Sequence, residues 1–314
     1  MCASFKDPRI LIGLVIFGLF IWKADVLTAL ATTPIDSLLF AGAALAFLVV
    51  IGVQMLRWNI LAAIAGLRGV AATRVWLAGQ LMNEVAPIGT GDLLKGWLLH
   101  KTSGKPAGHC MAIAFAERAA DVGMLCLIAI SAVVVLWARA DWLLRVLMLL
   151  VLPMVAAIAA LIFAPKRSLA LIARLVPHRG AKSKLLEMAE HFEAGVLTFR
   201  RQKRKAVLAA GFTLANWVLQ GAVHTLMFAA LGWWLQPTMV LQIVAVSWLL
   251  TIPAMLPGGL GIREVATTLF FSGLGVPVAI AGLEAMLFRA LSLIYLGPLG
   301  AAALARLPRA KTLI

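Results

Sequence analysis

Long apolar stretches dominate this chain, and several of them are long enough to cross a lipid bilayer as single helices. The hydrocarbon core of a bilayer is about 30 Å thick, which requires roughly 20 apolar residues per helix. The candidate spans are residues 10–31, 37–56, 111–137, 142–164 and 206–236, with a last span inside residues 266–305 that begins near Pro277. The pattern therefore predicts an all-α, polytopic helical membrane protein with six full spans.

Two further apolar stretches, residues 69–101 and 238–275, are interrupted near their middle by proline and glycine. The interrupting residues are Pro87, Gly89 and Gly91 in the first stretch and Pro257, Gly258, Gly259 and Gly261 in the second. Asp92 and Lys101 are nine residues apart, which is about 13.5 Å of helix and only half of a bilayer core. We therefore predict a re-entrant broken-helix hairpin over residues 69–101. We extend this prediction to residues 238–275 by analogy, although residues 238–256 could nearly span a bilayer.

The charged residues are few and mostly basic. The 314 residues are 63% hydrophobic and 13% charged, with a formal net charge of +15, whereas soluble domains are roughly 25% charged. This composition excludes a soluble nucleic-acid-binding domain. With the N-terminus inside, about 22 lysines and arginines, Arg57 and Lys95 included, fall on the cytoplasmic side and three on the other. The positive-inside rule then predicts a bacterial cytoplasmic (inner) membrane protein with both termini in the cytoplasm.

One polar segment is large enough to form a cytoplasmic loop, at about residues 165–205. Apolar residues recur there at helical spacing, and a run of arginine and lysine occupies residues 200–205. This pattern is typical of an interfacial amphipathic helix that binds the anionic lipids of the inner leaflet. In the alternative interpretation, the basic run only fixes the orientation of the chain.

The two interrupted stretches belong to an internal repeat. Both contain Pro-x-Gly-x-Gly followed by an acidic residue, at an offset of 170 residues. Gly104 and Pro106 match Gly275 and Pro277, and Arg118 matches Arg289, at an offset of 171. The predicted repeats are residues 1–138 and 139–314, each with three full spans and one hairpin. Because three is odd, the second repeat would have inverted topology, as in many transporters.

The proline and glycine breaks would expose backbone polar groups, which is tolerated at membrane depth only where they line a cavity. Glycines there allow close approach of a ligand or of another backbone. Asp92 follows Gly91 at a helix start and is a candidate N-cap, and the positive end of that helix would favour an anion. Alternatively, the glycines only form tight turns and Asp92 only caps the helix.

Ionisable residues at membrane depth are costly unless they are paired. The acidic set is Glu84, Asp92, Glu117, Asp121, Glu264 and Glu284, and its possible basic partners are Lys95, Arg118, Arg263 and Arg289. We interpret them as the lining of a polar cavity in which the arginines bind a phosphate head group, since guanidinium suits phosphate geometry. A purely structural salt-bridge network is the alternative. The cysteines and histidines show no ligand spacing, so we expect no metal and no cofactor.

These motifs together resemble one family. Asn83-x3-Pro87-x-Gly89-x-Gly91-Asp92-x2-Lys95, Glu117-Arg118-x2-Asp121 and Pro257-Gly258-Gly259-x-Gly261-x-Arg263-Glu264 are similar to the flippase-like transmembrane region of lysylphosphatidylglycerol synthase and its stand-alone relatives. The resemblance covers nearly the whole chain. It departs at Lys95, where an arginine is expected in many relatives. In size and form the chain looks most like the hopanoid-associated group.

The resemblance implies movement of a polar or anionic envelope lipid between leaflets. The candidate binding residues are Asn83, Asp92, Lys95, Glu117, Arg118, Asp121, Arg263, Glu264 and Arg289. This sequence lacks the soluble aminoacyl-transferase domain of the bifunctional relatives and the motifs of common hydrolases, so we expect no enzymatic activity. A small-solute or ion carrier and a membrane scaffold for lipid-biosynthesis enzymes are the alternatives. A homo-oligomer is compatible with each of them.

Overall fold

The structure, a computed structural model, describes residues 8–87, 89–137, 202–252 and 256–307, with isolated positions between 145 and 167. This part of the chain is all-helical, as predicted. Its helices are α1 (Pro8–Lys23), α2 (Val26–Thr32), α3 (Ser37–Ala62), α4 (Gly69–Val85), α5 (Thr90–Ser103), α6 (Ala107–Leu136), α10 (Lys203–Ala230), α11 (Pro237–Thr251), α12 (Ile262–Ser272) and α13 (Val278–Ala305).

Four of these helices, α3, α6, α10 and α13, are long and apolar enough to cross a membrane. They correspond to four predicted spans. The predicted span at residues 142–164 and most of the predicted basic loop lie outside the described residues, although α10 already begins at Lys203.

The first predicted span, residues 10–31, is not one continuous helix. The chain bends by 51° between α1 and α2, where Asp25 has a φ of 50° in the left-handed region. A non-glycine residue pays a steric cost in this conformation and does not continue a right-handed helix. The two helices together form a fifth candidate span only if the bent pair is counted as one.

The two interrupted stretches form helical pairs with breaks where the sequence predicted them. α4 ends at Val85 and α5 begins at Thr90, while α11 ends at Thr251 and α12 begins at Ile262. The longest of these helices, α4, has 17 residues, or about 25 Å, which is shorter than a bilayer core. The helices of each pair pack against one another.

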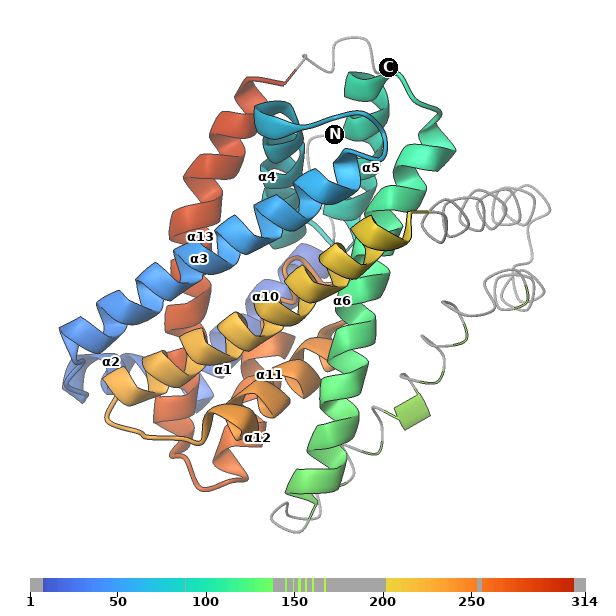
Figure 1. Cartoon of the computed structure of the whole chain (residues 1–314). Coiled ribbons are helices and arrows are strands. Elements are labelled where there is room, and N and C mark those ends of the chain that lie inside the picture. The colour runs from blue at the N-terminus through green and yellow to red at the C-terminus, as the bar shows by residue number, and fades with distance from the viewer. Residues whose placement is uncertain are drawn as a thin grey trace.

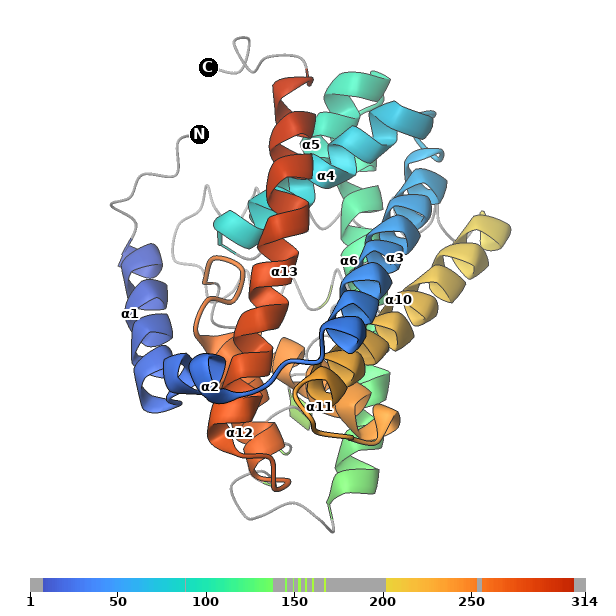
Figure 2. The ribbon, with the colours of Figure 1, turned by 90° about the vertical axis from the view of Figure 1, so that its left-hand side faces the viewer.

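The two halves of the chain pack across each other (Figures 1 and 2). α3 runs along α10, α4 packs on α13, and α11 packs on α6. The two breaks meet, because Pro87 and Pro257 form an isolated antiparallel bridge. Figure 2 shows the loop before α12 extending towards the lower ends of α4 and α5. The motif prolines, 170 residues apart in sequence, therefore lie side by side.

Two glycines bring α4 and α5 into close contact. A Cβ atom at Gly91 would overlap the carbonyl oxygen of Gly79, and one at Gly79 would overlap the side chain of Lys95. Gly91 therefore has the close-approach role that the sequence predicted for these glycines.

Candidate functional site

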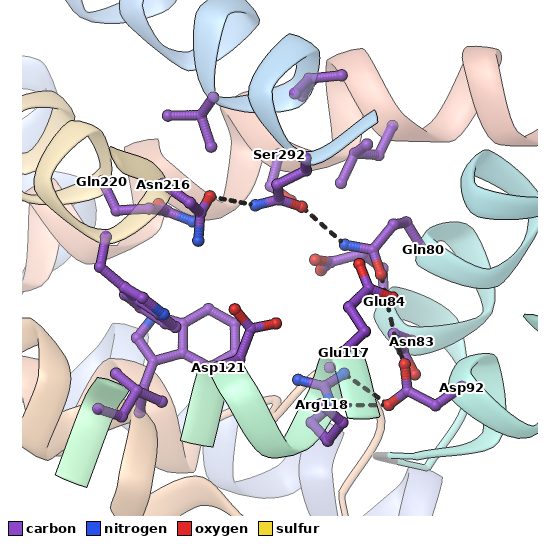
Figure 3. A pocket seen from close by; sticks show the side chains of 18 of the residues that line it. Gln80, Asn83, Glu84, Asp92, Glu117, Arg118, Asp121, Asn216, Gln220 and Ser292 are labelled. Atoms are coloured by element: carbon purple, nitrogen blue, oxygen red, sulfur yellow. Dashed lines mark hydrogen bonds and ion pairs between the residues drawn. The ribbon is translucent and has the colours of Figure 1, made fainter. Parts of the chain in front are cut away.

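A cavity of about 120 Å³ lies between the two halves and has room for several water molecules. Helices from both halves line it, and Figure 3 shows its polar side chains directed inward from opposite walls. The polar and charged lining residues are Gln54, Arg57, Gln80, Asn83, Glu84, Asp92, Lys95, Glu117, Arg118, Asp121, Asn216, Gln220, Thr251, Arg263 and Ser292. The protein thus has a polar chamber inside an apolar helical bundle.

Lys95 and Arg57 hold the acidic residues of one wall. Lys95 Nζ lies 2.9 Å from Asp92 Oδ1 and also contacts Glu117. Arg57 Nη2 donates to Glu117 Oε1 at 2.9 Å, and the same guanidinium binds Asp121. Both cations are therefore held between acidic partners, which compensates the cost of burying them.

Arg118 is the most accessible cation of this wall. Its Nε and Nη2 atoms both lie 2.7 Å from Asp92 Oδ2. Its side chain is 37% exposed, whereas that of Asp92 is 3% exposed. The guanidinium is thus fixed on one edge and remains accessible on the other (Figure 3).

In the second half, Arg289 links the two breaks. Its Nε donates to Glu264 Oε1 at 2.6 Å and its Nη2 donates to the carbonyl oxygen of Gly258 at 2.9 Å. Its Nη1 lies 4.0 Å from Glu84 Oε2 at the end of α4. Glu264 also accepts a hydrogen bond from the backbone N–H of Gly261 at 2.8 Å, across the start of α12. This network joins α12, α13 and the first half.

Arg263 differs from the other buried arginines. Its Nε is 3.6 Å from Glu264 Oε1, which is longer than a hydrogen bond. Among the residues that the structure describes, its buried Nη2 atom has no hydrogen-bond partner. Its guanidinium lies 4.9 Å from the ring centroid of Trp248 and 5.6 Å from that of Phe288. Arg263 is therefore positioned by aromatic rings, and one of its buried N–H donors is left unpaired among the described residues.

A row of amides crosses from the first half to the second. Gln80 donates to Gln54 at 3.1 Å, and Gln54 donates to Asn216 on α10 at 2.7 Å. Asn83 accepts from the backbone N–H of Gly91 at 3.0 Å. Figure 3 shows Asn216 and Gln220 on the wall opposite Glu84 and Asp92. These amides fix the distance between the walls without adding charge.

Most of the predicted site residues meet at this cavity. Its lining includes Asn83, Asp92, Lys95, Glu117, Arg118, Asp121 and Arg263. Glu264 and Arg289 are also buried but pair outside the main cavity, and Glu284 pairs with His224. The other amides of the lining were not predicted, because single amides in apolar helices have no distinctive spacing; they are Gln54, Gln80, Asn216 and Gln220.

Two basic residues that were counted on the cytoplasmic side are buried, and one of them, Lys95, was also predicted to pair with the buried acids. Arg57 and Lys95 are 3% and 2% exposed. α3 continues to Ala62 rather than ending near residue 56, so Arg57 is enclosed by the bundle. Its hydrogen bond with Thr213 also reaches the second half. Arg57 is thus a cavity residue. It was not predicted as one, because it was counted among the basic residues on the cytoplasmic side.

Asp92 is not the N-cap of α5, contrary to the sequence prediction. The cap position is Gly89, whose φ of 91° is in the left-handed region, and Asp92 lies in the first turn. From this position the Asp92 carboxylate binds Lys95 and Arg118 instead.

The comparisons place the chain in one family. A profile of the lysylphosphatidylglycerol synthase TM region matches residues 10–300. No curated protein and no solved structure matches the chain. The several apolar helices of membrane-spanning length agree with this match and indicate a multi-pass membrane protein. The chain therefore belongs to the lysylphosphatidylglycerol synthase TM region family.

Proposed function

We propose that this protein is a lipid transporter that moves a lipid with an anionic or polar head group between membrane leaflets. The main supporting observation is the cavity between the two halves, which Arg118 and Arg263 both line. The Arg118 side chain is partly exposed, and the buried Nη2 of Arg263 has no hydrogen-bond partner among the described residues. Guanidinium groups with free N–H donors suit phosphate oxygens. The head group would enter the cavity while the acyl or prenyl tails remain in the bilayer.

The proposal includes two inverted repeats with re-entrant hairpins, residues 1–138 and 139–314. Three features support it. The helix α4 packs on α13 as α11 packs on α6, the motif prolines pair with one another, and each half has an acid after its break that binds an arginine of the next long helix. In such folds the substrate site lies where the broken helices meet, and rocking of the repeats alternates access.

We further propose that the protein lies in a bacterial inner membrane with both termini cytoplasmic. Its basic segment at residues 165–205 would bind anionic lipids of the inner leaflet. The lipid would leave covalently unchanged, so the protein would act as a carrier and not as an enzyme. Mass spectrometry of lipid recovered after transport tests this last point, because any change in lipid mass would contradict it.

The test is head-group translocation in phosphatidylcholine vesicles that contain purified protein and acyl-labelled fluorescent phosphatidylglycerol. Arg118→Ala and Arg263→Ala should both reduce translocation to the rate of protein-free vesicles. Arg68→Ala is the matched control, because Arg68 is exposed and does not line the cavity. Each variant must elute as a single folded species before its rate is compared.

Normal translocation by both cavity variants would contradict the assignment of the site. Uptake of a water-soluble anion without lipid movement would instead favour a solute carrier. Loss of the protein's function only after neutralisation of the basic residues at 200–205, and not in the cavity variants, would favour a scaffold that recruits lipid-synthesis enzymes.

A further inference from the structure

A second buried titratable group lies outside the main cavity. His224 of α10 and Glu284 of α13 are 4% and 0% exposed. His224 Nδ1 is 2.7 Å from Glu284 Oε1, so one of these two atoms carries a shared hydrogen. Among the described residues, the buried His224 Nε2 and Glu284 Oε2 atoms have no hydrogen-bond partner. The pair therefore retains sites that can accept a further proton.

A small cavity lies beside His224 and shares part of its lining with the main cavity. Its volume is about 10 Å³, on the scale of a single water molecule. His224, Arg263 and Glu264 line it together. Arg263, Trp248 and Phe288 line both this cavity and the main one, so they separate the two chambers. Phe288 also stacks on the His224 ring, with centroids 4.1 Å apart.

Among the residues that the structure describes, the charged groups that face the pair lie on α12 and α13. Arg263 and Glu264 face it from α12, and Arg289, which binds Glu264, lies on α13 with Glu284. The helices α11 and α2 carry no charged residue. The charged residues of α3, α4 and α6 that line the main cavity instead are Arg57, Glu84, Glu117, Arg118 and Asp121.

We infer that His224 and Glu284 form a proton-binding site that couples a transmembrane proton gradient to movement of the lipid. This inference rests on the transport function proposed above and names its energy source. With one shared hydrogen the pair carries one negative charge, and uptake of a second proton at Nε2 or Oε2 makes it neutral. One proton binds from one side and leaves on the other, and only N–H or O–H bonds change.

Arg263 supplies the physical coupling between the two sites. Arg263 shares the Glu264 carboxylate with Arg289, so it is only partly neutralised and disfavours a further positive charge on the pair. An anionic head group that binds Arg263 in the main cavity removes this repulsion and favours proton uptake. By reciprocity, a protonated pair favours binding of the anion. The proton and the lipid would therefore bind together, as coupled transport requires.

The test uses the same vesicles and fluorescent phosphatidylglycerol, now with a pH gradient. An uncoupled carrier only equalises the label between the leaflets. Coupling to one proton drives an asymmetry of up to about tenfold per pH unit, because a tenfold proton ratio corresponds to about 1.4 kcal/mol. We expect the wild-type protein to accumulate the label in one leaflet, and a protonophore to abolish the asymmetry.

His224→Gln and Glu284→Gln should still equalise the label but lose the asymmetry. Glutamine can retain the hydrogen bond to the partner, and neither residue lines the main cavity. His109→Gln is the matched control, at a histidine on α6 away from the pair. Two variants are used so that, if one of them misfolds, the other still tests the inference.

The outcomes separate this inference from the proposed function. Equal leaflet distribution in the wild-type protein under a gradient would overturn proton coupling and leave transport intact. Asymmetry that persists in both glutamine variants would overturn the assignment to this pair. Absence of translocation under all conditions would overturn the transport function itself.

Discussion

The two halves of this protein have the same acid–arginine contact after their helix breaks, but the two arginines differ in exposure. In each, an acid in the first turn after the break binds an arginine on the next long helix, Asp92 with Arg118 and Glu264 with Arg289. The partners are 26 and 25 residues apart. The common pairing indicates that an acid–arginine contact fixes each short helix on its long neighbour.

The difference lies in exposure. The Arg118 side chain is 37% exposed and that of Arg289 is 6% exposed. Asp92 has Lys95 as a second cationic partner, while Arg289 also binds the backbone of the second break at Gly258. One arginine thus faces the cavity, and its counterpart holds the structure. In the proposed function, this contact would serve binding in the first half, while its counterpart in the second half would stabilise the fold.

The largest expected effect is the loss of stability in Arg289→Ala. Glu264 would become a buried charge without its close partner, and breaking a buried pair costs about 3–5 kcal/mol. Arg118→Ala should cost about 1 kcal/mol or less, because a partly exposed pair contributes little and Lys95 still binds Asp92. Thermal unfolding in detergent measures both variants. Equal losses would contradict the division of roles between the two halves.

The sequence predicted the parts of the fold that depend on local signals. Proline and glycine marked both breaks, and apolar length marked α3, α6, α10 and α13. The offset of 170 residues between Pro87 and Pro257 indicated two related segments, and these two residues form a bridge. Local composition was sufficient because each signal acts on its own segment of backbone.

The partners of buried polar groups could not be predicted in this way. Arg57 is 64 residues from Asp121 and 156 from Thr213, and His224 is 60 from Glu284. A single arginine near the end of an apolar stretch fits a topological signal as well as a buried site. Only the packing of α3 against α6 and α10 distinguishes these two possibilities.

Glycine substitutions should have an intermediate effect on the free energy of unfolding, and they compare the two breaks directly. In the first break, Gly89 has a φ of 91° with open space around it, while Gly91 provides close contact with Gly79. In the second, Gly261 has a φ of 81° and a Cβ there would lie 2.6 Å from Ile16. Gly91→Ala should cost about 1–3 kcal/mol through overpacking, and Gly89→Ala about 1 kcal/mol through backbone strain.

Gly261→Ala combines both costs, so it should lower the thermal midpoint more than Gly89→Ala does. Gly66→Ala is the control, because Gly66 also has a positive φ with open space but lies outside both breaks. Variants Gly91→Ala and Gly261→Ala that are as stable as Gly66→Ala would contradict the close packing at the two breaks.

The smallest expected effect on stability concerns two backbone N–H groups near the helix starts that follow the breaks, those of Gly91 and Gly261. Gly91 N–H donates to Asn83 of the preceding helix, whereas Gly261 N–H donates to Glu264 of its own helix. Asn83→Ala removes an acceptor and should cost about 1 kcal/mol, with faster hydrogen exchange at Gly91. Asn83→Asp keeps the acceptor but places a second carboxylate beside Asp92, which the asparagine amide approaches to 3.4 Å. It should therefore protect the Gly91 amide and still lower stability. Unchanged exchange at Gly91 in Asn83→Ala would show that the first break, like the second, stabilises its helix start without help from the neighbouring helix.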